Sequence, residues 1–221
     1  MSISVSGQGE AIGVPDLATM RLGVEAFETT VQAARAAAAA AMDKMIAVLK
    51  GRGVEDRDMQ TSSFDISPRF EVVEEQRKLI GYQVSNRITV KIRDLDAVGS
   101  IIDEVVAAGG DLTRFQGVSF SIENPKPLEE QARAAAGADL MDKAKQLAKL
   151  SGVELGTLVS INESGGSALR FSSLQEFTPA PDITPTTPIA PGEVEVMVTL
   201  QATFAINVPM AVLDGRLIPS A

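Results

Sequence analysis

Residues 81–124 read GYQVSNRITVKIRDLDAVGSIIDEVVAAGGDLTRFQGVSFSIEN, and this stretch decides the fold. Over residues 82–93 apolar and polar side chains alternate, which is the period of a strand with one buried and one solvated face. Apolar residues then recur at helical spacing over residues 95–109, and Asp94 offers a carboxylate to cap the first turn. Residues 118–122 alternate again. The stretch therefore predicts a strand, a helix and a second strand, each with one apolar face.

The same two patterns cover most of the remaining chain. Alternation predicts strands and helical spacing predicts helices on both sides of the central stretch. The predicted strands span residues 3–9, 20–27, 59–70, 158–161 and 193–206, and the predicted helices span residues 30–50 and 125–150. The order is strand-strand-helix-strand-strand-helix-strand-helix-strand-strand. It predicts an α+β fold in which antiparallel sheets carry three main helices packed on one side.

A helix followed by a glycine and a strand occurs three times, at Gly53, Gly109 and Gly152. The first and third glycines are both followed by Val-Glu. We interpret this recurrence as an αβ unit used repeatedly in one sheet.

Composition narrows the possible functions. The chain of 221 residues is 45% hydrophobic but only 4% aromatic, which predicts a core of aliphatic side chains and alanine. Its net charge of −9 argues against a nucleic-acid partner, because binding phosphates requires a concentrated basic surface. No apolar run approaches the ~20 residues that span a bilayer, and no signal peptide is visible. The sequence is that of a cytoplasmic protein or of the processed part of an exported one.

The chain contains no cysteine and no histidine. Without cysteine there is no disulfide, no thiolate metal site and no thiol nucleophile. Without histidine the usual zinc ligand and the usual general base near neutral pH are also missing. Most common designs of hydrolase and metalloenzyme are therefore excluded.

Three local clusters and one tyrosine could suggest chemistry, and each has a simpler structural interpretation. Gly7-Gln8-Gly9 could suggest a phosphate-binding loop, but a second strand follows it where a helix would be needed, so we interpret it as a flexible or bulged edge strand. Asp94 to Glu104 holds several acids without the spacing of a calcium loop, and acids are common near a helix N-terminus. Asp56-Arg57-Asp58 is interpreted as a polar turn, and Tyr82 as a packing residue. We predict no catalytic, cofactor-binding or metal-binding residue, and no cofactor.

Six consecutive alanines, residues 36–41, give the first predicted helix an unusual outer face. Ala33, Ala37, Ala40 and Ala47 are expected to lie opposite the sheet. Two interpretations stay open: a close-packed interface with another chain, or a solvated face in which alanine only supports the helix.

Residues 165–192 differ in kind from the rest. Five of the eleven prolines lie there among serine, threonine and glycine. Such a segment is expected to be extended or mobile, without helix or strand.

Six segments, in their order and spacing, resemble one family. They are ISVSGQGEAIGVPDLATMRLGV (3–24), DRDMQTSSFDISPRF (56–70), GYQVSNRITVKIRDLDAVGSIID (81–103), GVSFSIENP (117–125), KAKQLAKLSGVELG (143–156) and TPIAPGEVEVMVTLQATFAI (187–206). The chain resembles the SIMPL-domain proteins, a family of unknown function that includes periplasmic immunogenic proteins of Gram-negative bacteria. Gly110-Asp111 departs from the Ala-Asn expected there, and both pairs suit a turn. The resemblance predicts one domain over residues 1–207, including the proline-rich loop 165–192, and a C-terminal tail at 208–221.

The resemblance implies an α+β fold with antiparallel strands, a periplasmic or envelope location and homo-oligomeric assembly. It also implies a link to oxidative-stress tolerance, without an established enzymatic activity or catalytic residues. The expected protein is thus a non-enzymatic, exported protein of the periplasm or envelope that binds copies of itself and associates peripherally with the envelope. Its signal peptide is expected to be absent from the sequence given. The alternative is a carboxylate-based protein that binds a small molecule or a divalent cation, or an enzyme of that type.

Overall fold

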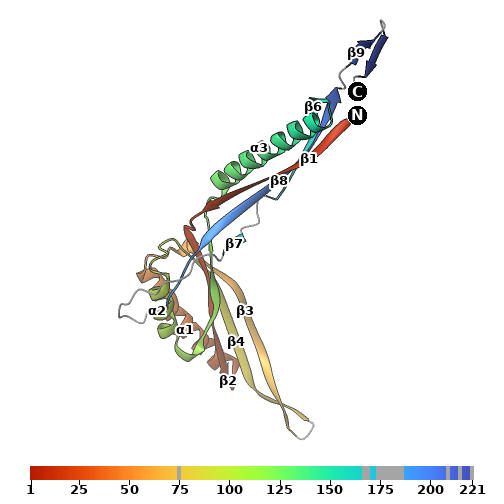
Figure 1. Ribbon diagram of the computed structural model, residues 1–221. Helices are drawn as coiled ribbons and strands as arrows, with labels where there is room; N and C mark the ends of the chain where they lie inside the picture. The colour runs from red at the N-terminus through yellow and green to blue at the C-terminus, as the bar shows by residue number, and fades with distance from the viewer. Residues whose placement is uncertain (74–75, 166–169, 173–186, 208–209, 214–215, 220–221) are drawn as a thin grey trace. The chain divides into compact units, whose positions relative to one another are not determined.

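The structure is a computed structural model, and it describes residues 1–73, 76–165, 170–172, 187–207, 210–213 and 216–219. The chain packs into two compact units. The first unit comprises Met1–Val14, Asn124–Leu174 and Gly192–Ala221, and the second comprises Pro15–Glu123 and Gln175–Pro191. Each unit contains a four-stranded antiparallel sheet with helices on one face (Figure 1). The predicted α+β fold is confirmed.

The second unit is built on the stretch that decided the fold. Its sheet has the strand order β3-β4-β2-β5, and all neighbours are antiparallel. The strands are β2 (Leu17–Glu28), β3 (Met59–Val73), β4 (Gln76–Ile92) and β5 (Thr113–Ser121). Because side chains alternate along β2 and β4, one face of both strands enters the core, and Met20, Leu22 and Val90 are fully buried there.

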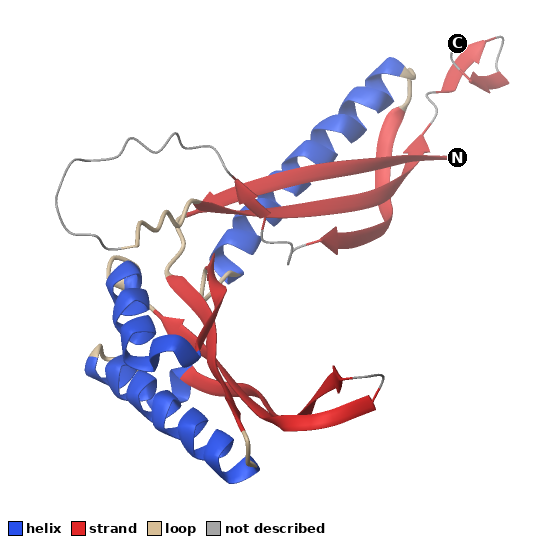
Figure 2. Ribbon diagram, turned by 90° about the horizontal axis from the view of Figure 1, so that it is seen from below, coloured by secondary structure: helices blue, strands red, loops and turns tan. Residues whose placement is uncertain are grey.

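Helices α1 (Val31–Gly51) and α2 (Val98–Gly109) cover that apolar face of the sheet, and Figure 2 shows both helices on the same side. Thr30 caps α1, because its Oγ1 accepts a hydrogen bond from the N–H of Ala33 at 3.2 Å. The buried residues of α1 recur at helical spacing along one face, as expected for a predicted helix that covers a sheet. They are Ala34, Ala38, Ala41, Met42, Met45 and Leu49.

Helix α2 begins later than predicted. Asp94 does accept a hydrogen bond, but from the N–H of Ala97 at 3.2 Å, and this bond closes a turn before the helix. The helix itself begins at Val98 and has Ala97 in the N-cap position. Short 3-10 turns, η1 (Asp56–Asp58) and η2 (Gly110–Leu112), connect α1 to β3 and α2 to β5.

The first unit has the strand order β1-β8-β6, and β7 also pairs with β8. Its elements are β1 (Ser2–Gly13), α3 (Lys126–Leu150), β6 (Glu154–Gly165), β7 (Arg170–Ser172) and β8 (Glu193–Asn207). The long strand predicted over residues 193–206 is confirmed as β8. Every second side chain from Val194 to Phe204 is buried, and those from Val196 onward form one core with α3.

Glycines let α3 lie very close to β1. A Cβ atom at Gly7 would overlap the carbonyl oxygen of Ala136, and one at Gly9 would overlap that of Ala132. The strand is an edge strand, as predicted, and its register with β8 runs without a shift, so of the two expected forms, flexible or bulged, the bulged one is wrong. The glycines of Gly7-Gln8-Gly9 therefore serve helix packing.

Two other expectations are corrected. The strands that follow Gly53 and Gly109 lie in the sheet of the second unit, whereas β6, which follows Gly152, lies in the sheet of the first. The αβ unit is thus not reused within one sheet. In the proline-rich segment, Arg170–Ser172 forms a strand paired with β8, contrary to expectation.

The structure describes only part of the remaining proline-rich segment. Residues 166–169 and 173–186 lie outside the described residues. Residues 187–191 form no helix or strand, as expected, and pack on α2: Ile189 contacts the core, and Thr187 passes directly over Gly99. In the tail, β9 (Met210–Leu213) pairs with β10 (Arg216–Pro219).

Candidate functional site

Asp94, Asp103 and Glu104 each have a structural partner, and these acids do not converge. Asp103 accepts hydrogen bonds from the backbone N–H of Thr187 at 3.0 Å and from its hydroxyl at 2.6 Å, which fastens residues 187–191 to α2. Glu104 pairs with Arg52, which follows α1. Within the residues that the structure describes, no group of three Asp or Glu side chains could hold a metal ion.

Asp58 has a larger role than a residue of a polar turn. It is 7% exposed, and Arg93 at the end of β4 donates two hydrogen bonds to its carboxylate, at 2.7 and 3.2 Å. The same guanidinium donates to Glu123 beyond β5, at 2.6 and 2.9 Å. The hydrogen bond from Arg93 lowers the pKa of Asp58, and also that of Glu123. The cluster joins η1, β4 and β5, and its guanidinium is occupied by the two carboxylates, so we assign it a structural role.

The uncovered face of the sheet in the first unit carries a shallow depression of about 410 Å³. Its polar lining is neutral and comes from β1, β6 and β8: Ser4, Ser6, Ser160, Asn162, Gln201 and Thr203. Ser4 and Thr203 are hydrogen-bonded to each other at 3.0 Å. Hydroxyls and amides can bind a ligand, but none of these groups has a pKa suited to acid-base catalysis near neutral pH.

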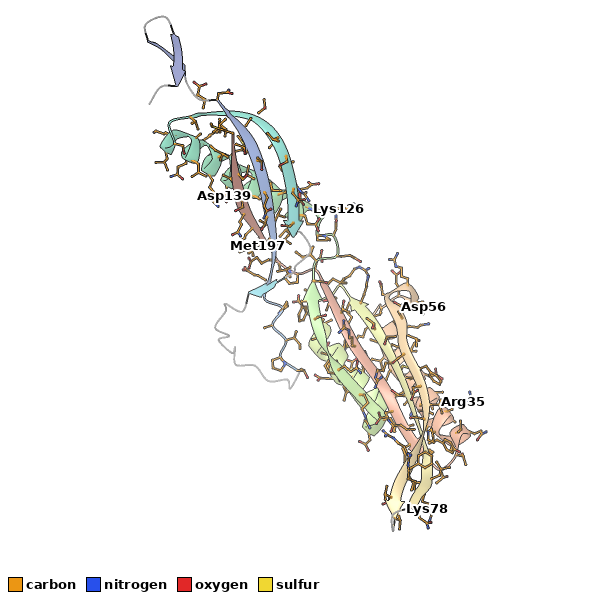
Figure 3. The ribbon with its side chains drawn as sticks, turned by 90° about the vertical axis from the view of Figure 1, so that its right-hand side faces the viewer. Arg35, Asp56, Lys78, Lys126, Asp139 and Met197 are labelled. Carbon is orange, nitrogen blue, oxygen red and sulfur yellow. The ribbon has the colours of Figure 1, made fainter. Side chains whose placement is uncertain are left out.

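Strands β3 and β4 continue beyond the helices as a hairpin arm, residues 64–73 and 76–86, whose outer part, 69–73 and 76–81, extends past the end of β2 as two strands (Figure 1). Lys78 lies near its end (Figure 3). The register pairs Ile66 with Val84, and Phe70 with Leu79. Directly opposed residues of an antiparallel pair point to the same face. One face of the arm is therefore apolar, and we call it the hairpin face: Phe64, Ile66, Phe70, Val72 and Leu79.

The hairpin face is exposed to solvent. Phe64 is 54% exposed, Phe70 45% and Val72 69%. Arg77 places its guanidinium 4.8 Å from the centre of the Phe70 ring, which covers part of that ring. The residues between them, such as Asp65 and Arg69, point to the opposite face, where Arg69 is hydrogen-bonded to Gln83.

The aromatic residues are distributed unusually for a folded chain. Among the aromatic side chains that the structure describes, only Phe120 and Phe204 are buried. The exposed ones include Phe64 and Phe70 of the hairpin face, and Tyr82 at its base is half-buried, as the packing interpretation requires. Large apolar side chains are normally buried, so a contiguous exposed group marks an interaction surface.

The sequence contained the signal for this surface, because Phe64, Ile66, Phe70 and Val72 alternate with polar residues. Alternation predicts an apolar face but does not tell whether the same chain covers it. We predicted the strand and not the uncovered face.

The folded chain is thus an α+β protein with two four-stranded antiparallel sheets, paired structural carboxylates and an uncovered apolar hairpin. Residues 3–204 match the SIMPL family, described as proteins of unknown function (DUF541), and the chain belongs to this family. It is 34% identical over 219 residues to a 26 kDa periplasmic immunogenic protein of Brucella abortus (strain S19), a match that covers 93% of this chain and 84% of the relative. It is 25% identical over 159 residues to the uncharacterized protein YggE of Escherichia coli (strain K12), covering 72% and 64%.

In the described part of the chain, no helix is long and apolar enough to span a membrane.

Proposed function

We propose that this chain is a non-enzymatic protein of the periplasm or envelope that functions by assembling with copies of itself. The observation that carries the proposal is the hairpin face, a group of neighbouring apolar side chains that are 39% to 69% exposed. A chain that exposes such a surface gains free energy when a partner covers it.

The chemistry of the chain supports a non-catalytic role. It has neither histidine nor cysteine, and the best-connected carboxylates, Asp58 and Glu123, are ion-paired with Arg93. An ion-paired carboxylate with a lowered pKa is a poor general acid or base near neutral pH. No observation in the described residues favours the alternative of a carboxylate-based cation site, because the acids of α2 bind Thr187 and Arg52.

The proposed location rests on the relatives, two of which are named periplasmic immunogenic proteins and match almost the whole chain. Fractionation of cells that express the natural gene tests it. Recovery with cytoplasmic markers would contradict the proposal.

Solution mass tests self-assembly directly. Light scattering on the full chain is expected to give a multiple of the 23.3 kDa protomer mass over a range of concentrations. A protomer mass at every concentration would overturn the proposal. Turnover of an ester, phosphoester or peptide that survives repurification and is lost on mutating a single carboxylate would overturn the non-enzymatic part.

A part in tolerance of oxidative stress belongs to the same proposal, and it follows from the family resemblance. A deletion strain is expected to survive peroxide less well than its parent, and the natural gene is expected to restore survival. Equal survival of both strains would contradict this part alone.

A further inference from the structure

The hairpin face has the sequence pattern of a buried surface. In β8 the same alternation places one face in the core of the first unit, where Val196, Val198 and Leu200 are at most 6% exposed. On the hairpin arm the five apolar side chains remain 39% to 69% exposed. An antiparallel strand with one apolar and one polar side packs its apolar side against another layer, and no described element of the second unit supplies that layer.

We propose that the hairpin face packs against the hairpin face of a second copy of this chain, about a twofold axis near Pro68. The inference rests on the proposed self-assembly and specifies the surface that mediates it.

The exposed area is of the right size for such a contact. Side chains of this kind each expose roughly 100 Å² at half exposure, so the hairpin face offers on the order of 450 Å². Two copies face to face would bury about 900 Å² of apolar area. This area is close to the ~1,000 Å² at which biological interfaces begin.

The geometry favours packing through the face over pairing through the strand edge. β3 is the edge strand of its sheet, but Pro68 has no N–H to donate to a neighbouring strand. β3 also has a bulge near Ser62, where its register with β4 shifts. Both features oppose the addition of another strand, whereas two sheets can pack face to face at about 10 Å.

A twofold axis makes the hairpin face complementary to itself. It places Phe64 and Ile66 of one copy over Phe70 and Val72 of the other, so an aromatic and an aliphatic residue meet at each end. Arg77, the charged residue on this face, lies toward the tip of the arm. The antiparallel arrangement keeps the two Arg77 side chains at opposite ends.

The charge of the arm argues against a lipid surface as the occupant. Residues 64–82 contain four acids and three bases, and the chain has a net charge of −9. Juxtamembrane segments that bind anionic lipid carry clusters of Lys and Arg.

Two serine substitutions test the interface. The variant Phe64→Ser/Phe70→Ser is expected to lower the mass of the wild-type assembly, or to raise the concentration of half-dissociation by at least about tenfold. Phe115→Ser is the matched control, because Phe115 is a phenylalanine with 41% exposure on β5, at the other edge of the same sheet. It is expected to leave the mass unchanged. Circular dichroism of each variant checks that the fold is retained.

The absence of cysteine allows a second, independent measurement. With a short bismaleimide, Pro68→Cys is expected to give cross-linked dimers of the full chain, whereas Ser67→Cys, whose side chain points to the opposite face, is not. Cross-linking through Ser67→Cys, or an unchanged mass for the double serine variant of an assembling wild type, would overturn the interface and leave self-assembly standing. A monomeric wild type would overturn both. Flotation of that monomer with phosphatidylglycerol vesicles would identify lipid as the occupant.

Discussion

Asp58 shows how one buried carboxylate can hold three elements together. Its hydrogen bonds from Arg93 keep its pKa below the ordinary value of 3.8. We expect Asp58→Asn to lower the free energy of unfolding by about 1–2 kcal/mol at pH 7, somewhat less than a fully buried charged hydrogen bond contributes. We expect a smaller value than for a fully buried pair because Arg93 is 43% exposed, so solvent partly screens its interaction with Asp58. Urea unfolding of both proteins measures the difference.

The pH dependence of this difference in unfolding free energy tests whether the ionised form of Asp58 stabilises the fold. A carboxyl group whose folded pKa is lowered stabilises the fold fully above its unfolded pKa, and this contribution is lost as the pH falls through the folded pKa. The difference between wild type and Asp58→Asn should therefore be constant between about pH 5 and 8 and shrink below about pH 4. Asp56→Asn, in the same turn, is the control, because Asp56 is 79% exposed and its ion pair with Lys50 should contribute little. A difference that grows on acidification would contradict the assigned role.

Gly9 tests the close approach of α3 to β1. A methyl group there would overlap backbone atoms of Ala132 and Ala136, which cannot rotate away as a flexible side chain can. We expect Gly9→Ala to destabilise the first unit by about 3 kcal/mol, the upper range for overpacking. Gly51→Ala is the control, since no atom lies within 4 Å of the added methyl group. Thermal unfolding compares them, and equal melting temperatures for both variants would show that α3 can move aside.

At the scale of elements, periodicity was sufficient to predict the three helices and, except for β7, the strands of the two four-stranded sheets. The pattern in residues 81–124 gave β4, α2 and β5 because each element buries one face and ends in a residue suited to a turn. Which strands pair with each other could not be predicted in this way. Strands β6 and β3 both follow a helix and a glycine, yet they lie in different sheets. Pairing depends on contacts between distant segments, which local spacing does not encode.

The candidate surface illustrates the same limit. Predicting that residues 64–72 form a strand needed only their alternation. Predicting that their apolar side is uncovered required knowing where α1 ends relative to the arm. Gly7 and Gly9 were misinterpreted for a similar reason, since their role depends on a helix that follows more than 100 residues later.

The outer face of α1 provides a prediction that separates the two candidate interfaces. Ala33, Ala40 and Ala47 are exposed as expected, whereas Ala37 is half-buried against the core, so that assignment was wrong. Exposed Arg35, Asp43 and Lys44 lie among these alanines. We therefore expect Ala40→Glu to leave the mass and melting temperature of the assembly unchanged, because glutamate is almost as good a helix former as alanine.

An interface on α1 would give the opposite result. Burying an unpaired carboxylate is strongly unfavourable, so loss of assembly in Ala40→Glu would assign the contact to α1. Light scattering on this variant beside Phe64→Ser/Phe70→Ser distinguishes the two surfaces in one experiment.

At the scale of the whole molecule, the two units have separate hydrophobic cores. The buried cluster of the second unit contains Met45 and that of the first contains Leu200, and the two clusters have no residue in common. A cooperative unfolding unit is one in which buried contacts are lost together. The interpretation of residues 1–207 as a single domain is therefore open to a direct test.

We expect the two units to unfold separately. Met45→Ala removes a fully buried side chain and should destabilise the second unit by about 2–5 kcal/mol, whereas Gly9→Ala should act on the first unit. Hydrogen exchange read by mass spectrometry follows each unit through its own peptides. Met45→Ala is expected to accelerate exchange in α1 and β4 and to leave α3 and β8 unchanged, and Gly9→Ala is expected to do the reverse. Acceleration of all four elements by either variant would instead show one cooperative fold, and would support the single domain that the family resemblance predicts.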